Sequence, residues 1–143
     1  MSEPDPQLRR NAEATSRLAA LVVRLGPADL ERPLGGGSTV AFALAHLAFW
    51  DVRQAIALGR YARDGLFPPE DATTNATLEA IAPLFRGDAV GPMAVRAAER
   101  ADAALRALTP VQRAALLEAG LAFAVERWRH RDEHVAQIEA VVG

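Results

Sequence analysis

The sequence predicts an all-α protein, a four-helix bundle of up-down-down-up topology with a long crossover between its second and third helices. Apolar residues recur at the three- and four-residue spacing of amphipathic helices, and glycine and proline cluster between these stretches. No stretch shows the apolar–polar alternation of a half-buried strand. With 143 residues, half of them hydrophobic, the chain suits one hydrophobic core, so residues 1–143 are expected to form a single domain.

The N-terminal part of the chain predicts a helix followed by a loop. Residues 6–25 carry apolar side chains at helical spacing on one face and arginine, asparagine, glutamate and threonine on the other. Gly26 and Pro27 provide a stop signal at the C-terminal end of this helix. Residues 27–37 hold two prolines and end in three consecutive glycines, which is the composition of a loop.

A second, more apolar helix is predicted over residues 39–63, with Ser38 or Thr39 as its N-cap. Apolar residues surround most of its girth, so we expect it to pack against neighbours on several sides. Residues 65–75 include Gly65 and a proline pair, and they end the helix. A link of this length suits a crossover, because a connection between adjacent antiparallel helices usually needs only about 2 to 8 residues.

The second half of the chain predicts two long and two short helical segments. Residues 77–85 are expected to form a short helix, and residues 92–108 a long one with alanine-rich packing positions and an arginine-rich outer face. Thr109 followed by Pro110 has the form of an N-cap with proline at the first helical position, so a short helical segment can start there. The last long helix is predicted over residues 121–142.

Charge and composition exclude several classes of function. The formal net charge is −2, so the counterion release that drives nucleic-acid binding has no evident source. The chain has no cysteine, and all 16 of its Lys+Arg residues are arginine, which excludes a thiolate nucleophile, a Schiff-base lysine and a disulfide framework. The longest apolar run, residues 40–50, is about half of the roughly 20 residues that a membrane span requires. We therefore expect a cytoplasmic protein without nucleic-acid or membrane partners.

The three histidines of the chain predict a metal site. His130 and His134 lie four residues apart on a predicted helix, which places both imidazoles on one face, about one turn apart. His46 lies in the most apolar helix, where an imidazole without a partner would carry a desolvation cost. A core histidine bonded to a carbonyl is the alternative, but chance poorly explains the i, i+4 pair.

The predicted ligand is one divalent metal ion held by His46, His130 and His134. Three neutral imidazoles suit zinc or nickel first, with iron or manganese as further candidates. A three-ligand site with room for a further ligand is the arrangement of catalytic sites and not of structural ones.

Three acidic residues lie close to the histidines in the sequence. Glu126 lies one turn before His130, so it is a candidate fourth ligand, a partner that orients an imidazole, or a general base. A solvated surface glutamate is the alternative. Asp51 and Asp132 lie at spacings that turn them away from the ligand face, so we leave them out of the site.

Aromatic and basic residues are further candidate neighbours of the metal. Trp50 and Trp128 are candidate walls of a pocket, although a tryptophan in a helical bundle is more often a core residue. Tyr61 and the pair Arg96 and Arg100 are candidates to hold an anionic group of a substrate. A solvated helix face is the favoured alternative for the two arginines.

Taken with these histidines, the chain resembles the DinB superfamily of metal-binding four-helix bundles, which includes thiol-dependent maleylpyruvate isomerases and bacillithiol transferases. The resemblance spans essentially the whole chain, and the family's histidine triad falls on His46, His130 and His134. The other matching residues are Thr39-Val40, the run from Leu44 to Asp51, Asn75, Leu108-Thr109-Pro110 and Gln137-Ile138-Glu139.

The resemblance implies an up-down-down-up bundle, often a homodimer, with the metal between the second and fourth helices. It also implies a small-molecule substrate and a low-molecular-weight thiol cosubstrate such as mycothiol, bacillithiol or glutathione. We accordingly expect a metal-dependent thiol S-transferase or isomerase, or a metal-assisted hydrolase, in which the ion lowers the pKa of a bound thiol or water. The alternatives are a non-catalytic metal-binding stress-response bundle that acts as a dimer, and a metal-free helical interaction domain.

Overall fold

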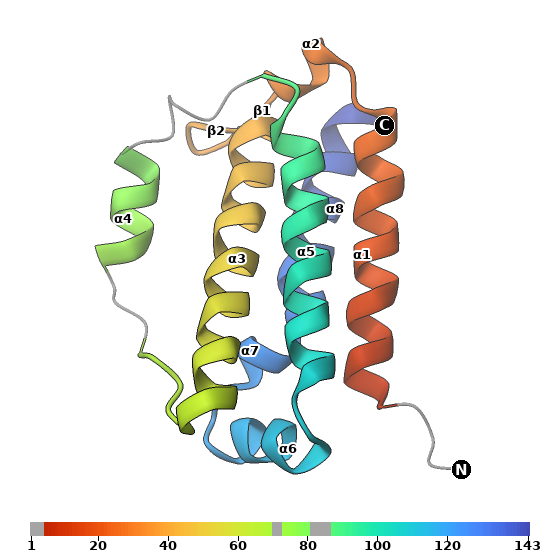
Figure 1. The fold of residues 1–143 in the computed structure, drawn as a ribbon. Helices are drawn as coiled ribbons and strands as arrows, with labels where there is room; N and C mark the ends of the chain where they lie inside the picture. The colour runs from red at the N-terminus through yellow and green to blue at the C-terminus, as the bar shows by residue number, and fades with distance from the viewer. Residues whose placement is uncertain (1–4, 70–72, 81–86) are drawn as a thin grey trace.

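The computed structural model describes residues 5–69, 73–80 and 87–143, and these are almost entirely helical (Figure 1), as predicted. The long helices are α1 (Pro6–Arg24), α3 (Val40–Asp64), α5 (Val90–Ala107) and α8 (Arg127–Val142). The short helices are α2 (Pro27–Leu30), α4 (Thr73–Ala80), α6 (Pro110–Glu118) and α7 (Ala122–Val125). Two short strands, β1 (Pro33–Gly35) and β2 (Ser38–Thr39), pair antiparallel before α3.

The four long helices pack side by side. Helix α1 contacts α5 and α8, and α3 contacts the same two helices. Helices α1 and α8 run toward the end of the molecule that carries α2, whereas α3 and α5 run toward the end that carries α6 (Figure 1). Helix α4 lies beside α3, within the connection between α3 and α5.

Local capping signals explain where the predicted helices begin and end. Helix α3 starts at its expected N-cap, because the Thr39 hydroxyl accepts a hydrogen bond from the Phe42 N–H at 3.1 Å. The same helix ends at Gly65, whose φ of 76° lies in the left-handed region that glycine adopts without strain. Thr109 caps α6 in the predicted manner, in a reciprocal capping box with Gln112.

Two predicted segments differ from the structure. The expected loop at residues 27–37 contains α2 and begins a β-hairpin whose turn uses positive φ at Gly35, Gly36 and Gly37 (98°, 60° and 82°). Strands of three and two residues are too short to show an alternating pattern. The short helix expected at residues 77–85 begins earlier, at Thr73, and residues 81–85 of that prediction lie outside the described part of the chain.

The last helix is also interrupted, which the sequence analysis did not predict. Glu126 separates α7 from α8 with non-helical φ and ψ of −93° and 61°. The buried side chain of Asn11 supports this break, because its amide donates to the Val125 carbonyl at 2.8 Å and accepts from the Trp128 N–H at 2.9 Å. These bonds satisfy backbone groups that a continuous helix would have paired internally. Gly120 precedes α7 with φ of 80°.

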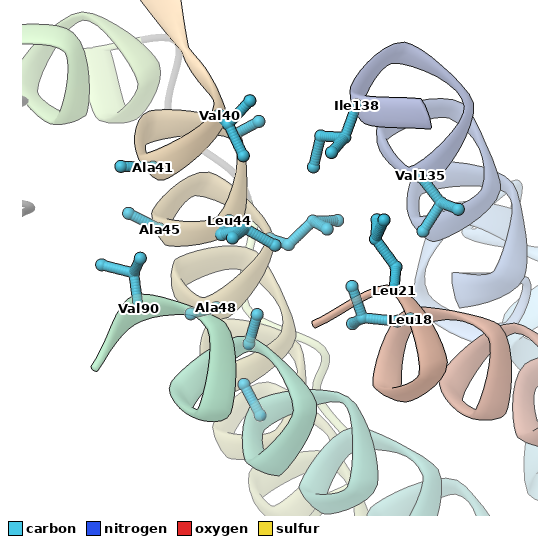
Figure 2. Close-up of a cluster of buried hydrophobic side chains, with 14 of the residues drawn as sticks. Leu18, Leu21, Val40, Ala41, Leu44, Ala45, Ala48, Val90, Val135 and Ile138 are labelled. Atoms are coloured by element: carbon cyan, nitrogen blue, oxygen red, sulfur yellow. The ribbon is translucent and has the colours of Figure 1, made fainter. Parts of the chain in front are cut away.

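A hydrophobic core lies between the long helices. Figure 2 shows Leu18 and Leu21 of α1 together with Val135 and Ile138 of α8, facing Leu44 and its neighbours on α3. Across the described residues, no helix combines the length and apolar character that crossing a membrane requires.

Candidate metal centre

The three histidines converge between α3 and α8. His46 comes from α3, and His130 and His134 come from neighbouring turns of α8. One ring nitrogen of each lies within 4.8 Å of the others, and the ring centroids are 4.7 to 5.2 Å apart. The structure therefore brings the predicted triad together as a group that can hold a metal ion.

Each histidine of α8 is held through Nδ1, and the two Nε2 atoms face each other at 3.2 Å. Arg127 Nη2 lies 3.2 Å from His130 Nδ1, and Gln137 Oε1 lies 2.9 Å from His134 Nδ1. A guanidinium can only donate, so the neutral His130 ring accepts at Nδ1 and carries its proton on Nε2. That proton is then donated to His134 Nε2, and His134 donates its own Nδ1 proton to Gln137.

Burial keeps the three imidazoles neutral. It lowers the pKa of His46 to about 4 and that of His130 to about 3, and the positive charge of Arg127 lowers both further. Burial also lowers the pKa of His134, against the opposing effect of the hydrogen bond that His134 donates to Gln137. Neutral imidazole is the form that coordinates metal ions, so the protonation state at neutral pH fits the predicted chemistry.

A buried cluster of one aspartate and two arginines lies next to the triad, and it was not predicted from the sequence. The Asp51 carboxylate is fully buried and accepts from Arg127 Nε at 2.8 Å and from Arg131 Nε at 3.1 Å. Burial raises the pKa of Asp51, but the two arginines more than offset this and hold the pKa below its usual value. Asp51 thus pairs with two arginines, and it fixes the guanidinium that contacts His130.

The structure does not bring Glu126 to the histidines. One of its carboxylate oxygens accepts from Gln7 Nε2 at 3.2 Å and the other from Arg129 Nε at 2.6 Å. The predicted one-turn spacing from His130 needs a continuous helix, and the chain breaks at Glu126 itself. Asp132 pairs with Arg17 at the surface, in agreement with its exclusion from the site.

A pocket of about 250 Å³ opens beside the triad. Its lining consists of His46, Trp50, Gln54, Asn75, Phe123, Arg127 and His130. Trp50 forms one wall, as predicted, and its indole N–H donates to Asn75 Oδ1 at 2.9 Å, which ties α3 to α4. A larger apolar pocket of about 480 Å³ lies between α3 and α5, and no histidine lines it.

The other predicted neighbours of the metal lie elsewhere. The Trp128 indole N–H donates to Gln7 Oε1 at 3.0 Å, away from the pocket. Tyr61 packs in a second core cluster with residues such as Leu58 and Leu105. Both arginines of the α5 pair, Arg96 and Arg100, are exposed, which agrees with the solvated alternative.

Asp51, Arg127 and Arg131 were not predicted as part of the site, but the sequence does contain a signal for each of them. An aspartate inside the apolar run of α3 needs a buried cation as its partner. Arg127 and Arg131 lie four apart on α8, on a stripe next to His130 and His134.

Comparison with protein-family models, curated proteins and solved structures found no match for this chain.

Proposed function

We propose that this chain is a metal-dependent enzyme of the DinB type, a four-helix bundle that holds one divalent ion through His46, His130 and His134. The observation that carries the proposal is the convergence of all three histidines of the chain, in neutral form, from two helices that are distant in the sequence. The directions of the long helices and the place of the triad between the second and the fourth of them support the resemblance. Zinc or nickel suits three imidazoles best.

The reaction we propose is transfer or isomerisation that uses a low-molecular-weight thiol. A bound ion would supply a lowered pKa for a thiol or a water molecule and so provide a nucleophile at neutral pH. The chain has neither cysteine nor lysine, so the nucleophile has to come from a cosubstrate or from water. The thiol ranks first because of the DinB resemblance, and metal-assisted hydrolysis ranks second.

The residues of the chain have separate roles in this proposal. The triad contributes no negative charge, which leaves the charge of the ion to attract an anionic ligand such as a thiolate. Gln137 orients His134 by accepting the proton of its Nδ1, whereas Arg127 donates to Nδ1 of His130 only while His130 carries its proton on Nε2. Trp50 and Phe123 line the adjoining pocket, where a substrate would lie partly shielded from water.

A structural ion without catalysis is the second candidate. The observation that favours it is that the three histidines come from two helices. An ion shared by His46 and the α8 histidines would cross-link α3 to α8. In that case we expect the protein to act through contacts in a homodimer.

Elemental analysis after zinc loading and desalting tests the metal site. We expect about one ion per chain in the unchanged protein. His46→Ala and His134→Ala should lose the ion, because two imidazoles hold it much less tightly than three. Arg96→Ala, which removes an exposed charge on α5, is the matched control and should keep it. Equal metal content in the histidine variants and the control would contradict the proposal.

Turnover distinguishes the two candidates. An S-transferase should consume an electrophile only with both zinc and a thiol present, whereas a hydrolase should need zinc but no thiol. A structural ion should give no turnover across a panel of thiols and electrophiles. Either kind of ion should stabilise the fold, by about 2.7 kcal/mol when free zinc is a hundredfold above its dissociation constant, so melting measures binding and not catalysis.

A further inference from the structure

Arg127 has hydrogen-bonding capacity that the described residues do not use. Its side chain is 5% exposed and is held on three sides, by Asp51 Oδ1 at 2.8 Å, the Phe123 carbonyl at 3.0 Å and His130 Nδ1 at 3.2 Å. These bonds use one N–H on each guanidinium nitrogen, and a guanidinium has five N–H groups. One N–H on each terminal nitrogen therefore has no acceptor among the residues that the structure describes. Both of these nitrogens belong to a side chain that lines the 250 Å³ pocket.

The charge that the described lining brings to the pocket is positive. The described lining contains one cation, Arg127, and no carboxylate. Outside this lining, Asp51 pairs with both Arg127 and Arg131, and Arg131 also pairs with Asp102, so two carboxylates balance the two arginines. The positive charge of Arg127 reaches the histidines as well, because it contributes to the lowered pKa of His46 and of His130. An anion with acceptor oxygens is the ligand that the remaining N–H groups of this buried guanidinium favour.

The volume of the pocket suits a small anion. Its volume of about 250 Å³ lies below the roughly 300 to 1,000 Å³ of pockets for drug-sized ligands. Trp50 and Phe123 give it two aromatic walls, and Gln54 and Asn75 add amide groups. The planar fork of a guanidinium matches the two oxygens of a carboxylate.

We infer that this pocket binds a small carboxylate-bearing molecule, with Arg127 as the residue that holds its carboxylate and the aromatic walls against its apolar part. The inference names a substrate class for the proposed function. It rests on that function only for the end of the ligand that reacts, which would lie against the histidines. The contact with Arg127 requires no metal ion.

Metal binding at the triad should strengthen this contact. A neutral imidazole has one proton for two nitrogens, so a His130 ring that holds a cation through Nε2 carries its proton on Nδ1. That Nδ1 no longer accepts from Arg127, and the N–H of Nη2 then becomes a further donor for the carboxylate.

The two tryptophans of the chain provide the measurement, because each gives one indole N–H signal in a nitrogen–proton correlation spectrum. Trp50 lines the pocket, whereas Trp128 lies elsewhere with its indole on Gln7. The probes are benzoate and its neutral isostere benzamide, each titrated into the full chain with and without zinc. We expect benzoate to shift the Trp50 signal and leave the Trp128 signal in place. Its dissociation constant should be at least about tenfold below that of benzamide, and lower still with zinc.

A matched pair of variants assigns the contact to Arg127. Arg127→Gln should remove the preference for benzoate, and Arg96→Gln, on the exposed face of α5, should keep it. The comparison of the two probes in the unchanged protein holds even if Arg127→Gln fails to fold. Equal affinity for both probes, or a benzoate preference that persists in folded Arg127→Gln, would overturn the inference.

The experiment separates this inference from the proposed function. A chain that binds no zinc yet prefers benzoate refutes the metal enzyme and supports the anion site. A chain that binds zinc at the triad and shows no preference for benzoate refutes the anion site alone.

Discussion

At the scale of single residues, the electrostatics of the three histidines decide how the site responds to pH. Each imidazole is partly or largely removed from water, and Arg127 adds a positive charge beside His130. Both effects disfavour protonation, so the pKa values of His46 and His130 fall to about 4 and about 3. Protons therefore compete with a metal ion at these two residues only in acid, well below the ordinary pKa of histidine.

Zinc affinity should consequently change little in weak acid. Three imidazoles of ordinary pKa would together lose on the order of several hundredfold in affinity between about pH 7 and about pH 5.5. Here His46 and His130 stay almost fully neutral over that range, and the lowered pKa of His134 limits its share. We expect a loss of less than about tenfold, measured by competition with a chromophoric chelator at each pH. A loss of a hundredfold or more would show that the histidines titrate as exposed groups do.

The triad could be predicted from the sequence, whereas the pairing of its supporting residues could not. The spacing of His130 and His134 is a property of one helix, and an imidazole in the apolar run around His46 called for a partner. Which arginine meets His130, by contrast, depends on the rotation of α8 against α3, which periodicity does not define. The pairing of Asp51 with Arg127 joins residues 76 positions apart in the chain, and it too depends on this rotation.

At the scale of helices and strands, local signals predicted most of the boundaries. Two features were missed, the break at Glu126 because it depends on a tertiary contact and the β-hairpin because its strands are short. The caps at Thr39 and Thr109 lie within three residues of the groups they bind, so they are visible in the sequence. The break at Glu126 depends on Asn11, which is more than 110 residues away. The β-hairpin before α3 was missed because its strands are too short for a pattern.

The contact between α1 and α5 makes a sharper prediction at the same scale. A Cβ atom at Gly91, in the first turn of α5, would lie 2.8 Å from Val22 Cγ1 of α1. Valine is stiff about χ1, so the clash has to be relieved by a shift of the helices. We expect Gly91→Ala to lower the free energy of unfolding by about 1 to 2 kcal/mol, measured by urea denaturation.

Gly59→Ala is the matched control for this substitution. Gly59 lies inside α3, and a Cβ there would meet only the flexible end of Arg63 at 3.7 Å. Alanine should raise the free energy of unfolding at this position by about 0.5 to 1 kcal/mol, because it favours helix more than glycine does. A stabilising effect of the same size at both positions would show that α1 and α5 are not packed as closely as the structure has them.

At the scale of the whole molecule, one buried side chain of α8 bonds to each of the other long helices. Arg131 is 0% exposed and donates to the Asn11 carbonyl and the Thr15 hydroxyl of α1. It also donates to both carboxylate oxygens of Asp51 on α3 and to Asp102 on α5 at 2.8 Å. The residue that follows His130 therefore joins all four long helices, so the metal site and the core share one polar network.

A buried network of charges adds little to the stability of the fold when it is intact, but the loss of one member is strongly destabilising. Removing charges from water is costly, so an intact pair is weak evidence for stability. Deleting one partner leaves the other charge buried without compensation, and that loss is large. In this protein Asp102 would keep only the hydroxyl of Thr15 if Arg131 were removed.

Arg131→Met should thus destabilise the whole fold, although it roughly preserves the volume of the side chain. We expect a loss of about 3 to 5 kcal/mol in the free energy of unfolding, measured by urea denaturation without added metal. Arg17→Met is the matched control, because Arg17 also joins α1 to α8, through Asp132 at 2.8 Å, but with half of its side chain in solvent. That variant should lose at most about 1 kcal/mol, since surface ion pairs contribute little. Losses of similar size in the two variants would show that burial of Arg131 does not make its ion pairs essential to the fold.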